Sequence, residues 1–151
     1  MGTENIIKLA NNIKNKYKGF SILDIIKRLN IRISYTNLNP KIYPAYTLNI
    51  NGNPTIILNS EYDIKSQNVL AAHELGHALL HKDNYYNQFG DERNGDQEYE
   101  ANLFAVSLLF NEDDFNIKFT SLTNYELKYL LDLNIRKWFN ERSIRYIFKK
   151  I

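Results

Sequence analysis

The chain contains no cysteine among its 151 residues. That absence excludes a disulfide framework and a zinc site built from thiolates, and it suits a reducing compartment. An excess of one charge is also lacking, because 19 basic and 17 acidic residues leave a formal net charge of +2. Such a balance creates no overall field that would attract nucleic acid or an anionic membrane, so binding to nucleic acid is not expected.

Long apolar runs are absent too: no stretch approaches the roughly 20 residues that a membrane-spanning helix needs. Residues 1–5 are polar and lack the basic, apolar and small-residue regions of a signal peptide, so we expect a cytoplasmic protein. The length is that of one compact domain. We expect a helical part over 1–30, a sheet with the site helices over 31–111, and a mainly helical part over 112–151.

The spacing of apolar residues and the capping residues predict the helices and strands of the first half of the chain. Apolar spacing predicts a helix over 5–18 that stops at Gly19, and Ser21 with Asp24 resembles a capping box for a second, short helix. Three short β-prone runs follow, at residues 31–35, 45–50 and 55–59. The turn signal at 51–54 joins the last two runs, which predicts a small three-stranded sheet, mixed or antiparallel.

The second half of the chain reads as helical. A helix over 64–81 is followed by a polar segment, 82–96, without periodicity, which we expect to be a loop. Further helices are expected over 97–110, after the capping box of Thr123 and Glu126, and over 135–149. The predicted fold class is α+β, with the small sheet packed on the helix over 64–81.

All three histidines lie inside one apolar run, residues 69–81, in which His73, Glu74 and His77 form an HExxH motif. On a helix, His73 and His77 lie one turn apart on one face, so both imidazoles can reach the same ion. Glu74 lies beside them and can take a proton from water. This arrangement is typical of zinc-dependent hydrolysis and predicts one Zn²⁺ per chain, with His73 and His77 as ligands and Glu74 as the catalytic base.

A catalytic zinc site needs a third protein ligand. His81 is excluded, because eight residues of helix place it about 12 Å along the axis from His73. The ligand must then be a carboxylate, either from the polar segment or from the helix that follows it. The candidates in the polar segment are Asp83, Asp91, Glu92 and Asp96.

The candidates on the following helix, where a side chain is held more rigidly, are Glu98 and Glu100. They lie about 200° apart around the axis, so only one can face the metal. Asn102 favours Glu98, because it follows on the same face and could steady the carboxylate or a ligating histidine. Glu100 remains the alternative third ligand.

Several segments together resemble the ImmA/IrrE family of zincin metallopeptidases: HELGH at 73–77, LH at 80–81, EYEANLFA at 98–105 and LL at 108–109. The resemblance covers roughly residues 43–111 and departs from the family at Asn111, where a proline is frequent. It implies a zincin-like, gluzincin-like fold with His73, His77 and Glu98 on the zinc and Glu74 as the base. It also implies a substrate, a helix-turn-helix transcriptional repressor, often of a mobile genetic element.

The expected function is therefore a zinc-dependent endopeptidase that cleaves such a repressor in trans, since nothing of the size of a helix-turn-helix domain precedes the motif. The alternative is a catalytically silent metal-binding regulator, or a toxin-type module, that sequesters a repressor. The intact Glu74 argues against that alternative. The sequence does not select the residue that would donate a hydrogen bond to the oxyanion. The candidates are five tyrosines and one arginine: Tyr43, Tyr46, Tyr85, Tyr86, Tyr99 and Arg93.

Overall fold

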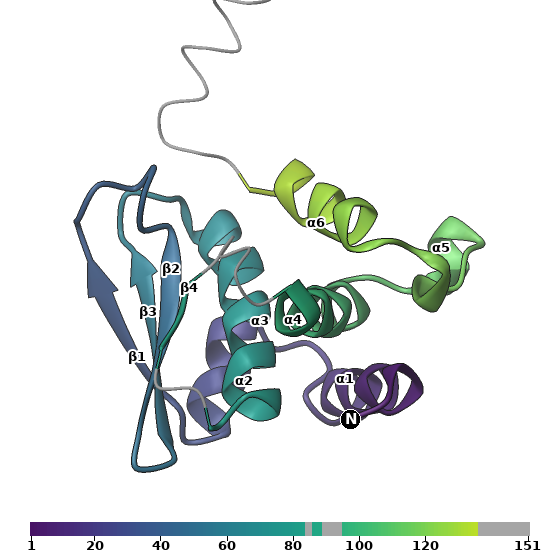
Figure 1. The fold of residues 1–151 in the computed structure, drawn as a ribbon, viewed down its shortest axis with the longest axis horizontal. Helices are drawn as coiled ribbons and strands as arrows, with labels where there is room; N and C mark the ends of the chain where they lie inside the picture. Colours follow the sequence, from purple (N-terminus) through teal and green to yellow (C-terminus); the bar gives the residue numbers. More distant parts are fainter. Residues whose placement is uncertain (84–85, 89–94, 136–151) are drawn as a thin grey trace, which may run out of the picture.

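A computed structural model describes residues 1–83, 86–88 and 95–135 of the chain. It has an α+β fold with a small mixed sheet and helices gathered on one side of it, as the sequence predicts (Figure 1). The predicted helix over 135–149 lies outside the described residues, except for Ile135. Within the described ranges, no helix is both long enough and apolar enough to cross a membrane.

The chain begins with two helices, α1 (Thr3–Lys16) and α2 (Ile22–Arg28). Helix α1 buries Ile6, Ala10 and Ile13 on one face, which is the face that the apolar spacing predicts. Gly19 follows with a positive φ of 90°. The side chain of Ser21 caps α2 by accepting a hydrogen bond from the backbone N–H of Asp24.

The sheet has the strand order β1-β3-β2-β4. Its strands are β1 (Arg32–Thr36), β2 (Ala45–Ile50), β3 (Asn53–Asn59) and β4 (Tyr86–Gln88). Strand β1 runs parallel to β3, whereas β2 is antiparallel to both β3 and β4, so the sheet is mixed. Strand β4 is an addition to the three predicted strands, because it forms inside the segment that was predicted as a loop.

The remaining elements are helical: α3 (Ile64–Leu80), α4 (Gly95–Leu109), α5 (Glu112–Phe115), the 3-10 turn η2 (Phe119–Ser121) and α6 (Asn124–Leu133). Helix α6 starts with the predicted capping box, in which Thr123 and Glu126 bond reciprocally. The short α5 and η2 were not predicted.

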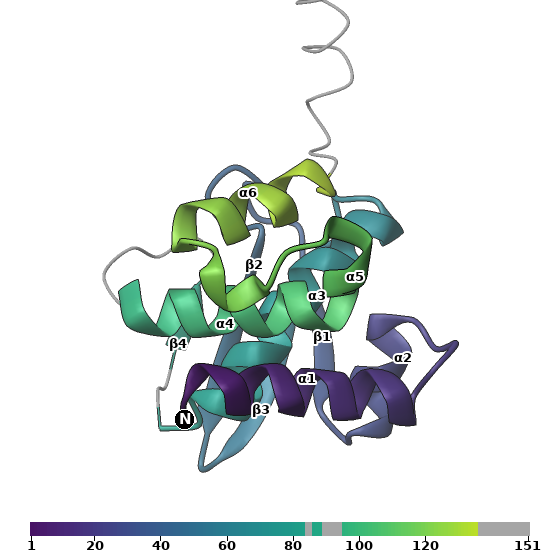
Figure 2. The same cartoon turned by 90° about the vertical axis from the view of Figure 1, so that its right-hand side faces the viewer.

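The helices stack in layers away from the sheet. Helix α3 lies between the sheet and α4, and α4 in turn packs against α1 and α6 (Figures 1 and 2). Because α3 and α4 have neighbours on opposite sides, both are apolar around most of their circumference, and most of their residues are buried. The polar side chains of α3 and α4 that meet between these two helices are therefore held inside the core.

Candidate metal centre

Helix α3 carries the HExxH motif in its second half. Asp63 caps the start of the helix, and its carboxylate accepts a hydrogen bond from the backbone N–H of Ser66 at 2.7 Å. His73 and Glu74 are fully buried, and His77 is 1% exposed. Unpaired polar groups at such positions would be costly, so each needs a partner on the sheet, on α4 or in a bound ligand.

Helix α4 supplies the third group of the cluster. Glu98 Oε1 lies 2.9 Å from His77 Nε2, and Glu98 Oε2 lies 3.4 Å from His73 Nε2. The two Nε2 atoms are 3.1 Å apart. Among the described residues, these three are the group whose histidine and carboxylate atoms converge closely enough to hold a metal ion.

The donor set fits a zinc ion. Around a tetrahedral zinc with bonds of about 2.1 Å, ligand atoms stand about 3.4 Å apart, which is close to the three separations in the cluster. Imidazole nitrogen and carboxylate oxygen are both ordinary zinc ligands, and three protein ligands leave a position for water. His73, His77 and Glu98 could therefore hold the ion that the sequence predicts.

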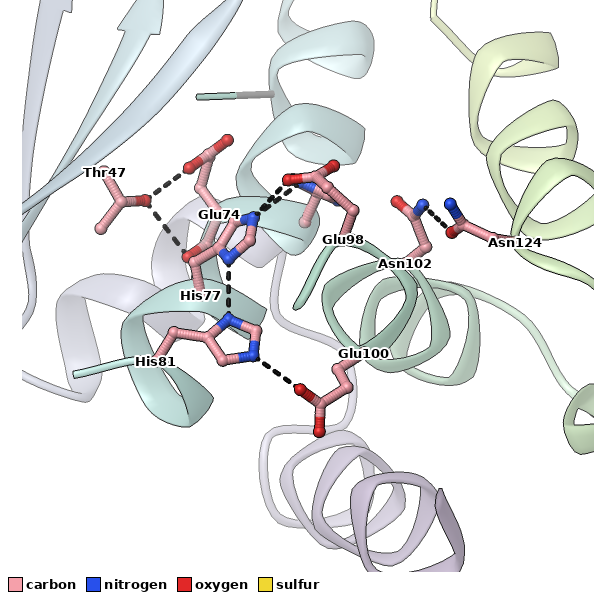
Figure 3. A network of polar contacts seen from close by, with 9 residues as sticks. Thr47, Glu74, His77, His81, Glu98, Glu100, Asn102 and Asn124 are labelled. Carbon is pink, nitrogen blue, oxygen red and sulfur yellow. Dashed lines mark hydrogen bonds and ion pairs between the residues drawn. The ribbon is translucent and has the colours of Figure 1, made fainter. Parts of the chain in front are cut away.

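Glu100, the alternative third ligand, points elsewhere. Its Oε1 lies 3.0 Å from His81 Nε2, and the other ring nitrogen of His81 faces His77 (Figure 3). His81 is the C-cap residue of α3, and it takes no part in the converging cluster. The structure thus brings Glu98 to His73 and His77, and it places Glu100 behind them.

The electrostatics of the cluster suit a bound cation. Although desolvation opposes it, hydrogen bonding from His73 and His77 lowers the pKa of Glu98 to about 2. Burial lowers the pKa of His77 to about 4, although its bond to Glu98 opposes that effect. The pKa of His73 is raised despite its burial, because Glu98 favours the charged form of the ring. The Glu98 carboxylate thus favours positive charge beside it, and a bound cation would supply that charge.

Glu74 lies on the sheet side of α3, and its carboxylate reaches β2. Burial raises the pKa of the Glu74 carboxyl to about 7, against the opposing effects of His73 and of a hydrogen bond from Thr47. The Thr47 hydroxyl donates that bond to Glu74 Oε2 at 2.5 Å (Figure 3). Glu74 Oε1 is buried and has no hydrogen-bond partner among the described residues. One oxygen of the carboxylate is thus anchored, and the other remains available to a water or a substrate proton.

Asn102, predicted to support the site, extends the network toward α6. Its side chain lies near His73 and favours the charged form of that ring. Its amide nitrogen donates a hydrogen bond of 2.7 Å to Asn124 Oδ1, at the start of α6 (Figure 3). Asn102 is therefore associated with His73 and α6, whereas the sequence left open whether it would support a histidine or the carboxylate.

Two of the tyrosines offered as oxyanion donors, Tyr46 and Tyr86, lie on the sheet face away from Glu74. Tyr46 neighbours Thr47 on β2, and successive side chains of a strand point to opposite faces. Tyr86 pairs with Leu48, so it shares the face of Tyr46, and the rings of the two tyrosines lie 5.6 Å apart. Neither lies on the sheet face that Glu74 contacts. Tyr85 and Arg93 lie outside the described residues.

Two supporting residues of the site were missed from the sequence. A Cβ atom on Gly76 would stand 3.1 Å from Ala101 Cα, so Gly76 allows α3 and α4 to approach closely beside the cluster. A glycine inside a helical pattern was a usable signal of such an approach. Thr47 could have been noticed as a polar inward position of β2, but its partner is not encoded in any local pattern.

Comparisons with known proteins point to a metallopeptidase-like family, in keeping with the histidine and glutamate cluster. The chain is 30% identical over 154 residues to a Bacillus phage phi105 protein named "Uncharacterized immunity region protein 2". That match covers 91% of this chain and 96% of the phage protein. The profile of the Peptidase_M78 family, described as the IrrE N-terminal-like domain, matches residues 26–140. With most of its length matched, this chain belongs to the Peptidase_M78 family of metallopeptidase-like, IrrE N-terminal-like domains.

Proposed function

We propose that this chain is a zinc-dependent endopeptidase that cleaves a helix-turn-helix transcriptional repressor in trans. The observation that carries the proposal is the convergence of His73, His77 and Glu98 beside a buried Glu74. Two imidazoles, one ligating carboxylate and one base are the groups that metal-assisted peptide hydrolysis requires. His73, His77 and Glu98 would hold one zinc ion per chain.

A zinc ion bound there would supply Lewis acidity, which acidifies water and polarises a peptide carbonyl. The chain's own part is proton transfer by Glu74. Its free Oε1 takes a proton from water as the water oxygen bonds to the carbonyl carbon, and it delivers that proton to the amine nitrogen as the C–N bond breaks. Thr47 holds Oε2 and so orients the carboxylate throughout.

The environment of Glu74 suits this task. A general base works best when its pKa lies near the working pH, and burial raises the pKa of Glu74 to about 7. A purely metal-binding regulator would have no use for a buried carboxylate beside its ligands, since such a group costs stability. The preserved Glu74 and its Thr47 anchor therefore favour a peptidase over a catalytically silent module.

The substrate is proposed on two grounds. The resemblance to the ImmA/IrrE family implies a helix-turn-helix repressor, and the phage relative carries an immunity-region name, a setting in which repressors act. Any helix-turn-helix repressor encoded beside this gene would be the first substrate to test, because the site geometry selects a reaction and not a substrate sequence.

The test incubates purified repressor with the zinc-loaded chain and with the Glu74→Gln variant, which keeps the side-chain shape and removes the base. We expect fragments of the repressor with the unchanged chain and a loss of at least 100-fold in rate with the variant. A Glu61→Gln variant, at an exposed glutamate ahead of α3, is the control for a lost charge. Equal survival of the repressor with the unchanged chain and with Glu74→Gln contradicts catalysis and favours sequestration.

A further inference from the structure

The second ring nitrogen of His77 has a partner that the HExxH motif does not include. His77 Nδ1 lies 2.8 Å from His81 Nδ1, and His81 Nε2 lies 3.0 Å from Glu100 Oε1. The three groups form a row that leads away from the cluster, from α3 across to α4 (Figure 3). His81 is only 7% exposed, so water is a poor substitute for either of its partners.

The direction of the hydrogen bonds follows from the chemistry of imidazole. A neutral histidine carries one proton, so a ring that binds metal through Nε2 must carry its proton on Nδ1. His77 Nδ1 then donates to His81 Nδ1, which must accept. His81 consequently carries its own proton on Nε2, and this N–H donates a hydrogen bond to the Glu100 carboxylate.

We propose that His81 and Glu100 are positioning residues that hold His77 in its metal-binding tautomer through this chain of two hydrogen bonds. The inference rests on the proposed metal site and adds two residues to it. A carboxylate that accepts a hydrogen bond from a ligand histidine fixes the ring and increases its basicity. Here the imidazole of His81 lies between the carboxylate and the ligand, so Glu100 orients His77 indirectly, through His81.

The opposite direction does not fit a metal ligand. If His81 Nδ1 donated to His77, the proton of neutral His77 would lie on Nε2 and would block the atom that faces His73 and Glu98. A neutral His81 would also present an unprotonated Nε2 to the Glu100 carboxylate at 3.0 Å, with two acceptors facing each other. Only the direction from His77 to Glu100 satisfies all four ring nitrogens together with a metal.

The backbone holds His81 in place for this role. Its N–H donates to the carbonyl oxygen of His77 at 2.8 Å as the last bond of α3. At this C-cap residue the backbone leaves the helical conformation, with φ −124° and ψ 49°. The ring is thereby placed 5.0 Å, centroid to centroid, from that of His77. The helix end is thus part of the site, although His81 is too far along the helix to be a ligand.

The first test measures the zinc affinity of the full chain by competition with a chelator. His81→Phe keeps a ring but removes both nitrogens, and we expect its affinity to fall about 10- to 100-fold. His81→Asn returns an acceptor near the position of Nδ1 and should recover part of the loss. Glu100→Gln keeps an acceptor oxygen without the charge, so about a three- to tenfold loss is expected. Glu61→Gln, an exposed control, should bind as the unchanged chain does.

The second test detects the hydrogen bond directly, and its main measurement uses the unchanged chain. In the ¹⁵N-labelled, zinc-loaded chain, an NMR experiment for coupling across N–H···N bonds should connect His77 Nδ1 to His81 Nδ1, with the proton on His77. In Glu100→Gln the same proton should exchange faster with water. The coupling establishes the direction of the hydrogen bond, and the zinc affinities of the variants establish its effect on the metal.

The proposal is overturned if the zinc-loaded chain shows the proton of His77 on Nε2, or if His81→Phe and Glu100→Gln both fold and bind zinc as the unchanged chain does. The outcome for the proposed function is read separately, from cleavage of the repressor. Zinc binding with the coupling present but without cleavage supports the positioning role and contradicts the peptidase. Cleavage with unchanged zinc affinity in both variants contradicts the positioning role alone.

Discussion

Gly76 and Ala101 lie at a close approach of the two site helices, since a Cβ atom on Gly76 would stand 3.1 Å from Ala101 Cα and 3.2 Å from its carbonyl oxygen. Both contacts are with backbone, which cannot rotate away. Gly76 neighbours His77 in sequence, and Ala101 lies one turn after Glu98 on α4. The spacing of the metal ligands therefore depends on a position without a side chain.

The substitution Gly76→Ala tests this dependence. Alanine favours a helix over glycine by about 1 kcal/mol, but forcing a methyl group into a packed interface costs about 1–3 kcal/mol. We expect a small net loss of unfolding free energy in urea and a clear loss of zinc affinity, because α3 and α4 must move apart. Gly95→Ala, at an exposed glycine of α4 with no atom near its Cβ, is the control: it carries the same change in helix propensity and should leave the zinc affinity unchanged. A tighter zinc site in Gly76→Ala would show that the close approach is not required.

Replacement of Thr47 by valine should change the pH dependence of cleavage. Valine keeps the shape of the side chain but cannot donate to Glu74, so one interaction that lowers the pKa of Glu74 is removed. The base is active when ionised, so the acidic limb of the rate profile should move to higher pH. Thr47→Ser keeps the hydroxyl and should retain the original profile. An acidic limb that stays in place in Thr47→Val would exclude Thr47 as the anchor of the base.

Glu74 should also destabilise the metal-free protein above neutral pH. Its pKa is raised from 4.5 to about 7, so the folded state holds the proton more tightly than the unfolded state does. The penalty is therefore absent below about pH 4.5, grows as the pH rises toward 7, and is complete above that. Glu74→Gln should increase the unfolding free energy at pH 8 by an amount on the order of 2 kcal/mol, and by little at pH 4.5.

Urea unfolding of both metal-free proteins at the two pH values measures this difference. Because His73 and Glu98 interact electrostatically with Glu74, the difference between the two proteins reports the titration of Glu74 together with its coupling to these two residues. An equal effect of Glu74→Gln at pH 4.5 and pH 8 would contradict a buried base with a raised pKa.

Lys14 should support the scaffold without affecting the metal. Its Nζ donates to the carbonyl oxygens of Ser107 and Phe110 at 2.8 and 2.9 Å. This side chain of α1 therefore caps the carbonyl groups at the C-terminal end of α4. Lys14→Met should lower the unfolding free energy by about 1 kcal/mol while zinc affinity stays the same. Lys8→Met, on the exposed side of α1, is the control. A loss of zinc affinity in Lys14→Met would show that this end of α4 is coupled to the site.

The fold was predictable where local signals are strong. The bounds of β2 match the prediction, and the caps at Ser21 and Thr123 start helices where expected, because each of these features depends on a few neighbouring residues. Strand β4 was not predictable, since its short polar sequence pairs only because the edge of β2 is available. The formation of β4 therefore depends on its pairing with β2 in the folded protein, which its own residues do not indicate.

The site was predictable to the level of residue types and helix faces. Periodicity placed His73 and His77 on one face and separated Glu98 from Glu100, which is the separation that the structure shows. The supporting groups were not predictable in the same way. Thr47 reaches Glu74 from a strand 27 positions earlier in the chain, and a contact of that kind leaves no spacing pattern in the sequence.

Calorimetric titration of zinc into the metal-free chain tests the central claim most directly, with Glu98→Gln and Glu74→Gln measured beside the unchanged protein. The account predicts one ion per unchanged chain, similar binding in Glu74→Gln, and a loss of at least 100-fold in affinity in Glu98→Gln. Absence of zinc binding by the unchanged chain, or full affinity in Glu98→Gln, would contradict a site built from His73, His77 and Glu98.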